Sequence, residues 1–461
     1  MAVMSDRRFP EGFVLGAATS AAQIEGSVDA DGRGPSIWDT FAATPGTIED
    51  GSDPSIACDH YRRWRDDVGR MRDLGLNAYR FSIAWPRILP QGTGTARGAG
   101  LDFYDHLVDE LLDAGIQPFA TLYHWDLPQV LQDRGGWTSR ETVDAFVEYA
   151  GVVTARLGDR VTAWTTHNEP WCIAHLGHHL GKQAPGVKDP LAGLTAAHHV
   201  LLSHGAALPV IRENAPGAEV GIVLNLVPGE CVEDSPAGDD VVRSFDGFFN
   251  RWYLDPLFRG RYPEDVIADR VQQGDLPSAE LPFVEEGDLD VISRSVDYLG
   301  VNYYSRAVFR VGPQGEPVGI RSGKPAQRND MGWEDYPPGL RRLLVRLHEE
   351  YAVPRLYVTE NGGAWSDAPD AEGRVRDHRK IRYLHGHLHA ALDALDAGVP
   401  LRGYFAWSLL DNWEWAHGYP KRFGFYWVDY ETQERIAKDS ALWYRDVIAR
   451  HGLDDELSLP V

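Results

Sequence analysis

Short runs of β-branched and aromatic residues alternate along the chain with longer segments in which apolar residues recur three and four positions apart. The short runs have the length and composition of buried strands, and the longer segments have the period of amphipathic helices. The predicted strands are 13–18, 77–83, 117–123, 161–166, 219–224, 296–301, 356–359 and 401–406. The helices predicted between them include 59–74, 101–114, 140–157, 191–214, 340–351 and 378–397. Eight βα units predict an α/β fold, a (β/α)8 TIM barrel.

No domain boundary interrupts this alternation of predicted strands and helices. Pro and Gly are spread along the 461 residues, and no polar or low-complexity stretch is long enough to act as a linker. We therefore predict a single TIM-barrel domain over 1–461, with about 1–8 and 452–461 as terminal extensions. Since a typical barrel has about 250 residues, the excess length is expected in extended βα loops such as 29–56 and 230–289.

Polar and aromatic residues follow the predicted strands at the points where the strands end. They are Gln23, Arg80, His124 with Trp125, Asn168 with Glu169, Asn225, Asn302 with Tyr304, Glu360 and Trp407. In a (β/α)8 barrel the carboxyl ends of all strands meet at one face, which is where such enzymes place their active sites. These side chains are therefore expected to form one site.

Two of these residues are glutamates, each followed by a chain-breaking signal. Glu169 precedes Pro170, which favours an extended backbone at Glu169, and Glu360 precedes the turn signal Asn361-Gly362. A single strand-end carboxylate is more often a solvated surface group. Together with the other strand ends, however, the two glutamates form the carboxylate pair that hydrolysis of a glycosidic bond requires.

Such a pair works only if the two carboxyl groups differ in protonation at one pH. Repulsion between like charges raises one pKa, whereas a cation and hydrogen bonds hold the other group ionised, and Arg80 and the Tyr304 phenol are candidates for that role. A separation of about 5 to 5.5 Å predicts retention of anomeric configuration, and about 6.5 to 9.5 Å predicts inversion. The sequence leaves both mechanisms open.

The segment that leaves the eighth predicted strand is rich in tryptophan and carries an acid, Glu414. Aromatic planes stack on the C–H faces of sugar rings, and carboxylates accept hydrogen bonds from neighbouring hydroxyls. We predict core packing for Trp413. Glu414 needs polar partners among these rings, which favours a binding role.

The charge and cysteine content narrow the classes of partner. A formal net charge of −23 disfavours nucleic acid and anionic membrane surfaces and leaves small neutral substrates as the easier partners. Cys58, Cys172 and Cys231 are scattered, without the spacing of a disulfide framework or a zinc site. With no signal core at the N-terminus and no run approaching about 18 apolar residues, we expect a soluble cytoplasmic protein.

Histidines gather on two predicted helices. His385, His387 and His389 have metal-like spacing, but the helix lies on the outer ring of the barrel, and we predict a solvated helix and no metal site. The same interpretation is given to His198, His199 and His204. His124, at a strand end, is instead a candidate partner for a sugar hydroxyl.

Seven motifs in this order resemble glycoside hydrolase family 1, the β-glucosidase family, from about Phe9 to about Ile448. They are FVLGAATSAAQIEG at 13–26, YHWDLP at 123–128, THNEPW at 166–171, GVNYY at 300–304, GW at 332–333, TENG at 359–362, and the segment from 404 that ends in KRFG at 421–424. Each motif alone is weak, but their joint order and spacing are highly specific.

The resemblance implies roles for individual residues. Glu360 matches the nucleophile and Glu169 the acid/base. Residues implied to bind the sugar are Gln23, His124, Asn168, Glu414 and Trp415, with Trp407 beneath the ring and with Asn302, Tyr304 and Phe423 close to the substrate. Arg80, Asn302 and Tyr304 match the shell around the nucleophile, and Trp171 and Trp333 match the aglycone side.

The resemblance also implies the substrates. They are β-glycosides such as aryl glucosides, cellobiose and short cello-oligosaccharides, cleaved by a β-glucosidase that needs no metal ion or organic cofactor. The oligomeric state is left open, with a homo-oligomer as one alternative. Glu414 and Phe423 favour unphosphorylated sugars. Ala22, His178, His179 and Gln183 depart from the usual pattern and leave the aglycone preference open.

Two hypotheses from other classes remain at this stage. A sugar-binding barrel without catalysis would be expected to lack one of the two glutamates, and both are present. A metal-dependent barrel hydrolase would need clustered His and Asp ligands at strand ends, which the sequence does not offer.

Overall fold

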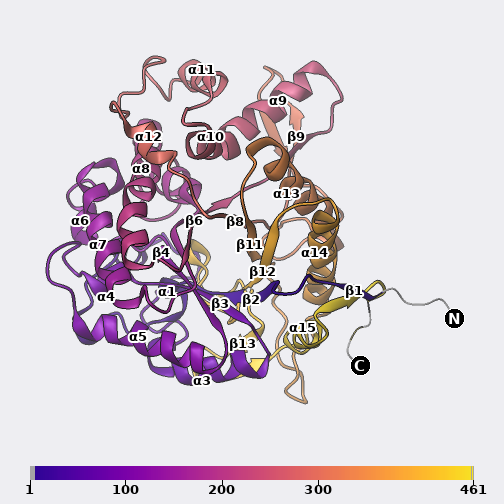
Figure 1. Cartoon of the computed structure of the whole chain (residues 1–461). Coiled ribbons are helices and arrows are strands. Elements are labelled where there is room, and N and C mark those ends of the chain that lie inside the picture. The colour runs from indigo at the N-terminus through magenta and orange to yellow at the C-terminus, as the bar shows by residue number, and fades with distance from the viewer. Residues whose placement is uncertain (1–5, 458, 460–461) are drawn as a thin grey trace.

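The computed structural model describes residues 6–457 and 459. Its centre is a closed barrel of parallel strands in the order β11-β12-β2-β3-β4-β5-β6-β8 (Figure 1). The strands are β2 (Val14–Ala18), β3 (Ala78–Ser82), β4 (Gln117–Tyr123), β5 (Ala163–Asn168), β6 (Glu219–Asn225), β8 (Tyr298–Asn302), β11 (Leu356–Asn361) and β12 (Leu401–Trp407). The predicted TIM barrel is confirmed, and every predicted strand forms.

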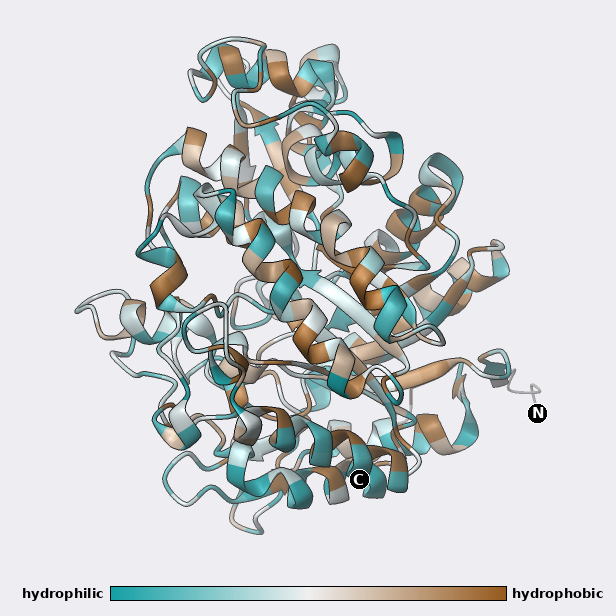
Figure 2. Cartoon of the chain, turned by 60° about the vertical axis from the view of Figure 1, so that its left-hand side comes forward, coloured by the Kyte–Doolittle hydropathy of each residue, from teal (hydrophilic) through white to brown (hydrophobic). Residues whose placement is uncertain are grey.

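Helices surround the barrel in the outer layer of Figure 1. The long ones are α3 (His60–Asp73), α5 (Gly98–Asp113), α7 (Glu141–Leu157), α8 (Pro190–Asn214), α13 (Pro337–Tyr351), α14 (His378–Asp396) and α15 (Asp439–Arg450). All but α15 were predicted. Figure 2 shows hydrophobic and hydrophilic residues alternating along these helices, as expected for elements with one face on the barrel.

Shorter helices occupy the connections. They are α1 (Ala21–Ile24), η1 (Ala30–Gly32), α2 (Ile37–Ala42), α4 (Trp85–Ile88), α6 (Gln129–Gln132), η2 (Gly136–Thr138), η3 (Cys172–His179), α9 (Pro236–Asp246), η4 (Gly247–Arg251), α10 (Trp252–Arg259), α11 (Glu264–Gln273), α12 (Asp288–Ile292), η5 (Pro325–Gln327) and η6 (Trp415–His417). The remaining strands are β1 (Asp6–Arg8), β7 (Gly229–Cys231), β9 (Ala307–Val311), β10 (Pro317–Ile320), β13 (Tyr426–Val428), β14 (Arg435–Ala437) and β15 (Gly452–Asp454).

One expectation about an irregular segment was wrong. Residues 230–289 were predicted as a loop, but α9 to α12 fill much of this segment, and Ser235 caps α9 by accepting a hydrogen bond from the Gly238 amide at 3.2 Å. The two terminal extensions pair with each other, because β1 and β15 form an antiparallel sheet. Strand pairing there satisfies backbone groups that short ends would otherwise expose to water.

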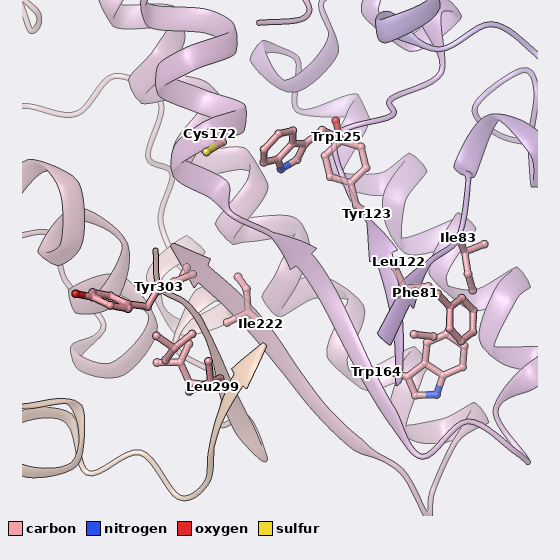
Figure 3. Close-up of a cluster of buried hydrophobic side chains, with 14 of the residues drawn as sticks. Phe81, Ile83, Leu122, Tyr123, Trp125, Trp164, Cys172, Ile222, Leu299 and Tyr303 are labelled. Atoms are coloured by element: carbon pink, nitrogen blue, oxygen red, sulfur yellow. The ribbon is translucent and has the colours of Figure 1, made fainter. Parts of the chain in front are cut away.

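Apolar side chains form two layers on either side of the barrel wall. Because strand residues alternate in direction, Phe81 of β3 and Ile83 just after it face the helices, whereas Ala78 belongs to the barrel interior. Figure 3 shows part of the outer layer, with Phe81, Ile83 and Leu122 beside the strands. Arg80 has the same parity as Ala78, so its side chain is directed into the barrel towards its carboxyl end.

Helix α8 has the length and composition of a membrane span, the only such helix found among the described residues. However, 78% of its most apolar window is buried inside the fold. Its apolar residues therefore pack against the protein, as in the core helix of a globular domain.

The pairing of β5 and of β11 shifts register close to their carboxyl ends, between Thr165 and Asn168 and between Val358 and Glu360. Such irregularities are common next to active sites because they turn a side chain away from the regular alternation. In β5 the shift ends at Asn168, and in β11 it ends at Glu360. Both are predicted site residues.

Candidate active site

A pocket of about 370 Å³ opens at the carboxyl ends of the barrel strands. The predicted residues that line it are His124, Trp125, Glu169, Trp171, Asn225, Asn302, Tyr304, Trp333, Glu360, Trp407, Glu414, Trp415 and Phe423. The three others, Gln23, Arg80 and Asn168, are buried behind the wall. Each of these three is hydrogen-bonded to a residue of the lining. The structure thus brings all the predicted site residues together.

Glu360, near the end of β11, is buried and receives two strong hydrogen bonds. Arg80 Nη1 donates to Oε1 at 2.6 Å, and the Tyr304 hydroxyl donates to Oε2 at 2.6 Å. Both contacts favour the ionised carboxylate. Burial raises the pKa of Tyr304 well above its usual value, so the phenol keeps the proton that it donates.

The side-chain amide of Asn168 orients this arginine. Arg80 Nη2 donates to Asn168 Oδ1 at 2.7 Å, and Asn168 Nδ2 lies 3.1 Å from His124 Nε2. An amide NH₂ can only donate, so His124 Nε2 accepts and the proton of the neutral imidazole resides on Nδ1. Burial, followed by the charge of Arg80, lowers the pKa of His124 well below its usual value, which agrees with a neutral ring.

Glu169 lies in a different environment from Glu360. Asn302 Nδ2 donates to its Oε1 at 2.6 Å, and the Cys172 thiol donates to its Oε2 at 3.0 Å, with no cation in direct contact among the described residues. Burial and then repulsion by Glu360 raise the pKa of Glu169 above its ordinary value, against the lowering effect of these two donors. Glu169 therefore keeps its proton to higher pH than an ordinary carboxyl group does.

The backbone at Glu169 is left-handed, with φ of 53°, so the extended conformation predicted from Pro170 was wrong. Tertiary hydrogen bonds hold this strained geometry. The Glu169 amide donates to the Val223 carbonyl at 2.9 Å, and Trp125 Nε1 donates to the Asn168 carbonyl at 2.8 Å. A left-handed non-glycine residue costs on the order of 1–3 kcal/mol and is found chiefly where function requires it.

Asn302 was placed by resemblance in the shell around the nucleophile, yet its amide nitrogen contacts Glu169 and Asn168. Thr359 donates to Asn302 Oδ1 at 2.8 Å, and this bond fixes which end of the amide faces Glu169. Asn302 therefore orients the carboxyl group of Glu169.

Glu414 stands opposite, on the segment after β12. Gln23 Nε2 donates to Glu414 Oε2 at 3.1 Å and also reaches Asn412 Oδ1 and the Trp413 carbonyl, each at 3.0 Å. Burial and then the charge of Glu360 raise the pKa of Glu414 to about 8. Gln23 is therefore the polar partner that Glu414 requires among the aromatic rings.

The aromatic residues divide between core and pocket. Trp413 is fully buried and donates from Nε1 to the Ser52 hydroxyl at 3.0 Å, so its predicted core role is confirmed. Trp407 and Trp415 each lie near His124 with roughly parallel rings, at centroid distances of 6.0 and 5.9 Å. On the outer side of the pocket, Trp333 packs against Tyr304 at 5.2 Å.

Several lining residues were not predicted to belong to the site, including Cys172, Leu176, Phe249 and Met331. Cys172 could have been found from its spacing, because a residue three positions after Glu169 lies one helical turn away. Phe249 could not, since it belongs to the segment that was taken for a loop.

We predicted that the histidines on these two helices are exposed to solvent. This prediction is wrong for His198, His204 and His387, which are buried. His387 packs against Tyr383 with ring centroids 3.9 Å apart. His198 bonds Asp288 at 3.0 Å, and His204 bonds Thr166 at 2.7 Å. They are buried core histidines, and in the described part of the chain no group of three or more His, Cys, Asp and Glu is arranged to hold a metal ion.

Comparison with known proteins gives concordant results over nearly the full length. The sequence profile of glycosyl hydrolase family 1 matches residues 5–453. The chain is 45% identical over 453 residues to β-glucosidase A of Thermotoga maritima, covering 98% of this chain and all of that protein. It is 50% identical over 456 residues to the thermostable β-glucosidase B of Thermobispora bispora, covering 97% and 92% of the two chains.

A solved structure, the family 1 β-glucosidase from T. maritima in complex with isofagomine lactam, superposes with a TM-score of 0.93 at 45% identity. The match covers 97% of this chain and 100% of that chain. The barrel, the pocket with its two glutamates and the full-length matches agree, and the chain belongs to glycosyl hydrolase family 1.

Proposed function

We propose that this chain is a retaining, exo-acting β-glucosidase, which releases terminal non-reducing β-D-glucosyl residues through a covalent glycosyl-Glu360 intermediate. The observation that carries the proposal is the unequal environment of two buried glutamates in one pocket. Glu360 is hydrogen-bonded by a cation and a phenol, whereas Glu169 is buried with weaker donors. One carboxylate is prepared to attack and one carboxylic acid to donate a proton.

In the first step, a Glu360 oxygen attacks the anomeric carbon as the glycosidic C–O bond breaks. Glu169 gives its proton to the departing oxygen, so the aglycone leaves as a neutral alcohol or phenol. Arg80 and Tyr304 hold Glu360 ionised and directed before attack. The product of this step is a glycosyl ester on Glu360 and an ionised Glu169.

In the second step, Glu169 acts as a base. Once Glu360 is an ester, its negative charge is gone and the pKa of Glu169 falls, because the repulsion that raised it has been removed. The ionised Glu169 takes a proton from water, and the resulting hydroxide attacks the anomeric carbon and displaces Glu360. Two inversions give net retention and return both glutamates to their starting protonation states.

The glycone is proposed to bind on the side of Glu414. Glu414 and Gln23 would share neighbouring hydroxyls, and His124 and Asn168 would hold others, while Trp407 and Trp415 supply flat apolar surfaces. A carboxylate at Glu414 would repel a phosphorylated sugar. The proposed substrates are therefore unphosphorylated aryl β-glucosides, cellobiose and short cello-oligosaccharides.

No step of this mechanism draws on a metal ion or an organic cofactor. The proposal treats residues 1–461 as one catalytic domain, acting on small glycosides in the cytoplasm, with a homo-oligomer as a possible assembly. Treatment with a chelator is expected to leave activity unchanged.

Proton NMR during hydrolysis of an aryl β-glucoside tests the proposal. The first glucose formed should carry the β-anomeric proton, with the α-anomer increasing only as mutarotation proceeds. Initial release of α-glucose would show inversion and refute the double displacement. Loss of turnover on chelation would point to the metal-dependent alternative.

A further inference from the structure

The hydrogen bonds that hold Glu360 continue behind the pocket into three buried residues that the mechanism above does not use. They are Asn361, which follows Glu360 in β11, Tyr383 of α14 and Tyr404 of β12. At most 1% of each residue is exposed to solvent. We call these three residues the support cluster. Because bulk water does not reach groups at this depth, the hydrogen bonds between them fix their positions.

The hydrogen bonds of the support cluster run in one direction, from Tyr404 towards Tyr304. The Tyr404 hydroxyl donates to Asn361 Oδ1, so the other end of that amide is the NH₂ group. Asn361 Nδ2 lies 3.0 Å from the Tyr383 hydroxyl oxygen and can only donate, so this oxygen accepts. The single proton of the Tyr383 hydroxyl is then donated to the Tyr304 carbonyl, 2.9 Å away.

The two chain segments that form the nucleophile site meet at the Tyr383 hydroxyl. One is the segment after β8, where the Tyr304 phenol donates to Glu360 Oε2 at 2.6 Å. The other is β11, whose Asn361 side chain also donates to the Tyr303 carbonyl at 2.6 Å. The Tyr303 amide in turn donates to the Glu360 carbonyl at 3.0 Å. Tyr383 therefore joins the segment of the phenol to the strand of the carboxylate.

The ring of Tyr383 is itself held by the next turn of α14. His387 stacks on it, with ring centroids 3.9 Å apart and an angle of 29° between the planes. His387 Nδ1 donates to the Tyr383 carbonyl at 2.8 Å, since a carbonyl can only accept. Burial lowers the pKa of His387 to about 3 and raises the pKa of Tyr383 well above its usual value, so both rings stay neutral. His387 thus packs beside the site.

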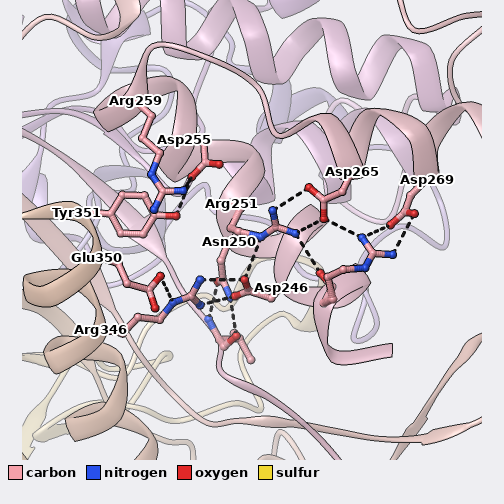
Figure 4. A network of polar contacts seen from close by, with 12 residues as sticks. Asp246, Asn250, Arg251, Asp255, Arg259, Asp265, Asp269, Arg346, Glu350 and Tyr351 are labelled. Atoms are coloured by element: carbon pink, nitrogen blue, oxygen red, sulfur yellow. Dashed lines mark hydrogen bonds and ion pairs between the residues drawn. The ribbon is translucent and has the colours of Figure 1, made fainter. Parts of the chain in front are cut away.

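A second polar network in the molecule serves as a comparison (Figure 4). It joins the segment from α9 to α11 to helix α13 through arginine–carboxylate pairs such as Arg346 with Asp246. Tyr351 of this network donates from its hydroxyl to Asp255 at 2.7 Å, and Asp255 is also paired with Arg259. The residues labelled in Figure 4 do not line the catalytic pocket. This network connects helices, whereas the support cluster ends on the residue that bonds Glu360.

We propose that Tyr383 is a positioning residue for the nucleophile, because its hydroxyl fixes Tyr304 so that the Tyr304 phenol donates to Glu360 before attack. This inference rests on the proposed function. Without the hydroxyl, the Tyr304 carbonyl and Asn361 Nδ2 lose this partner, and Tyr304 can tilt away from Glu360. Attack by the less well oriented carboxylate is slower, whereas the side chains that bind the glycone keep their contacts.

The test is Tyr383→Phe, which removes one oxygen atom and keeps the packed ring. Phenyl β-glucoside has a poor leaving group, so formation of the glycosyl-enzyme limits its turnover. For this substrate kcat should fall about tenfold, while KM changes by less than about twofold. The rate at which a 2-deoxy-2-fluoro-β-glucoside labels Glu360 reports the same step and should fall equally.

Tyr351→Phe is the matched control, because it also removes one hydroxyl from a buried tyrosine of an outer helix. The Tyr351 hydroxyl bonds a carboxylate, so its loss should lower Tm at least as much as Tyr383→Phe does. Its kcat and KM should equal those of the wild type. Wild-type kcat in Tyr383→Phe as well would mean that Tyr383 only stabilises the fold, and the inference would be wrong.

A double-mutant cycle tests whether Tyr383 acts through Tyr304. Tyr304→Phe removes the phenol that bonds Glu360 and should lower kcat by itself. In that background Tyr383→Phe should lower kcat by less than about threefold, because the group that it positions is absent. An undiminished loss in this background would show that Tyr383 acts independently of Tyr304 and would overturn the inference.

If Tyr383→Phe does not fold, Tyr404→Phe provides the same test. It removes the donor that fixes the Asn361 amide and should lower kcat about threefold with KM unchanged. A folded Tyr404→Phe with wild-type kcat would then contradict the inference. Failure of the proposed function is distinguishable, because the wild type itself would leave phenyl β-glucoside uncleaved and Glu360 unlabelled.

Discussion

The two halves of the ligand space differ in how they are built. The inner half, around Glu360 and Glu414, is a set of hydrogen-bonded polar side chains that the barrel strands and the segment after β12 supply. The outer half, around Trp171 and Phe249, is a set of partly exposed rings at the start of η3 and on η4. The barrel thus fixes the bond-breaking chemistry, whereas helices in the connections determine what lies beyond the bond.

Glu169 stands at the boundary between these halves. Asn302 binds one of its oxygens from the barrel side, and Cys172 of η3 binds the other. The properties of the proposed acid/base therefore depend on both halves. Substitutions in the inner half and in the outer half should therefore differ in the size and in the kind of their effect on activity.

The largest effect is expected at Glu360. Replacing it by Gly removes the attacking oxygen, and kcat should fall by at least about 10⁴-fold for every β-glucoside. Azide should restore cleavage of a 2,4-dinitrophenyl glucoside and give the α-glucosyl azide, because the small anion can occupy the space of the lost side chain. Near-normal turnover by the folded variant, without azide, would contradict the assignment.

Glu169→Ala should have a smaller effect that depends on the leaving group. For a phenyl or cellobiose leaving group, general acid catalysis is lost and the first step should slow by about 10²–10⁴-fold. For 2,4-dinitrophenolate, which needs no proton, that step should be nearly unaffected. A plot of log kcat/KM against leaving-group pKa should steepen, and an unchanged slope would count against the acid role.

Glu414 tests the inner half alone. Glu414→Gln keeps the shape but replaces one carboxyl oxygen by an amide NH₂ group, which can only donate, and kcat/KM for β-glucosides should fall about 10- to 100-fold as hydrogen bonds from the glycone hydroxyls are lost. β-Fucosides lack the 6-hydroxyl group and should lose less. Equal losses on the two glycones would mean that the carboxylate does not bind near that hydroxyl.

The smallest effect is expected at Cys172, on the outer side of Glu169. Glu169 must be protonated to act as acid, so kcat/KM should fall as pH rises through its pKa of about 7. The thiol donates to Glu169 and stabilises its ionised form, so Cys172→Ala should move this alkaline limb to higher pH by less than about one unit. A shift to lower pH would show that the thiol does not donate to the carboxylate.

The sequence predicted the inner half better than the outer half, and the reason is physical. Strand periodicity and turn signals are local, and they located the barrel strands and the residues at their carboxyl ends. Family resemblance then distinguished Glu360 from Glu169. The roles of Gln23 and Glu414, which lie in different motifs, also required the resemblance, because no local pattern connects residues so far apart.

The outer half depends on contacts that local patterns do not encode. Segment 247–259 folds as η4 and α10 although Pro256 lies inside the second helix, since long-range contacts such as Arg346 with Asp246 hold it. The left-handed backbone of Glu169 depends on the Val223 carbonyl, 54 residues away along the chain. His198 is buried because Asp288 accepts from it, and nothing near His198 in sequence indicates that partner.

The division of labour between Glu360 and Glu169 can be tested most directly by trapping the intermediate. After incubation with 2,4-dinitrophenyl 2-deoxy-2-fluoro-β-glucoside, mass spectrometry should find one fluoroglucosyl group per chain, and peptide sequencing should place it on Glu360. The label should be lost slowly, with recovery of activity. A label on Glu169, or no label from an enzyme that is inactivated by neither this compound nor its analogues, would contradict the account.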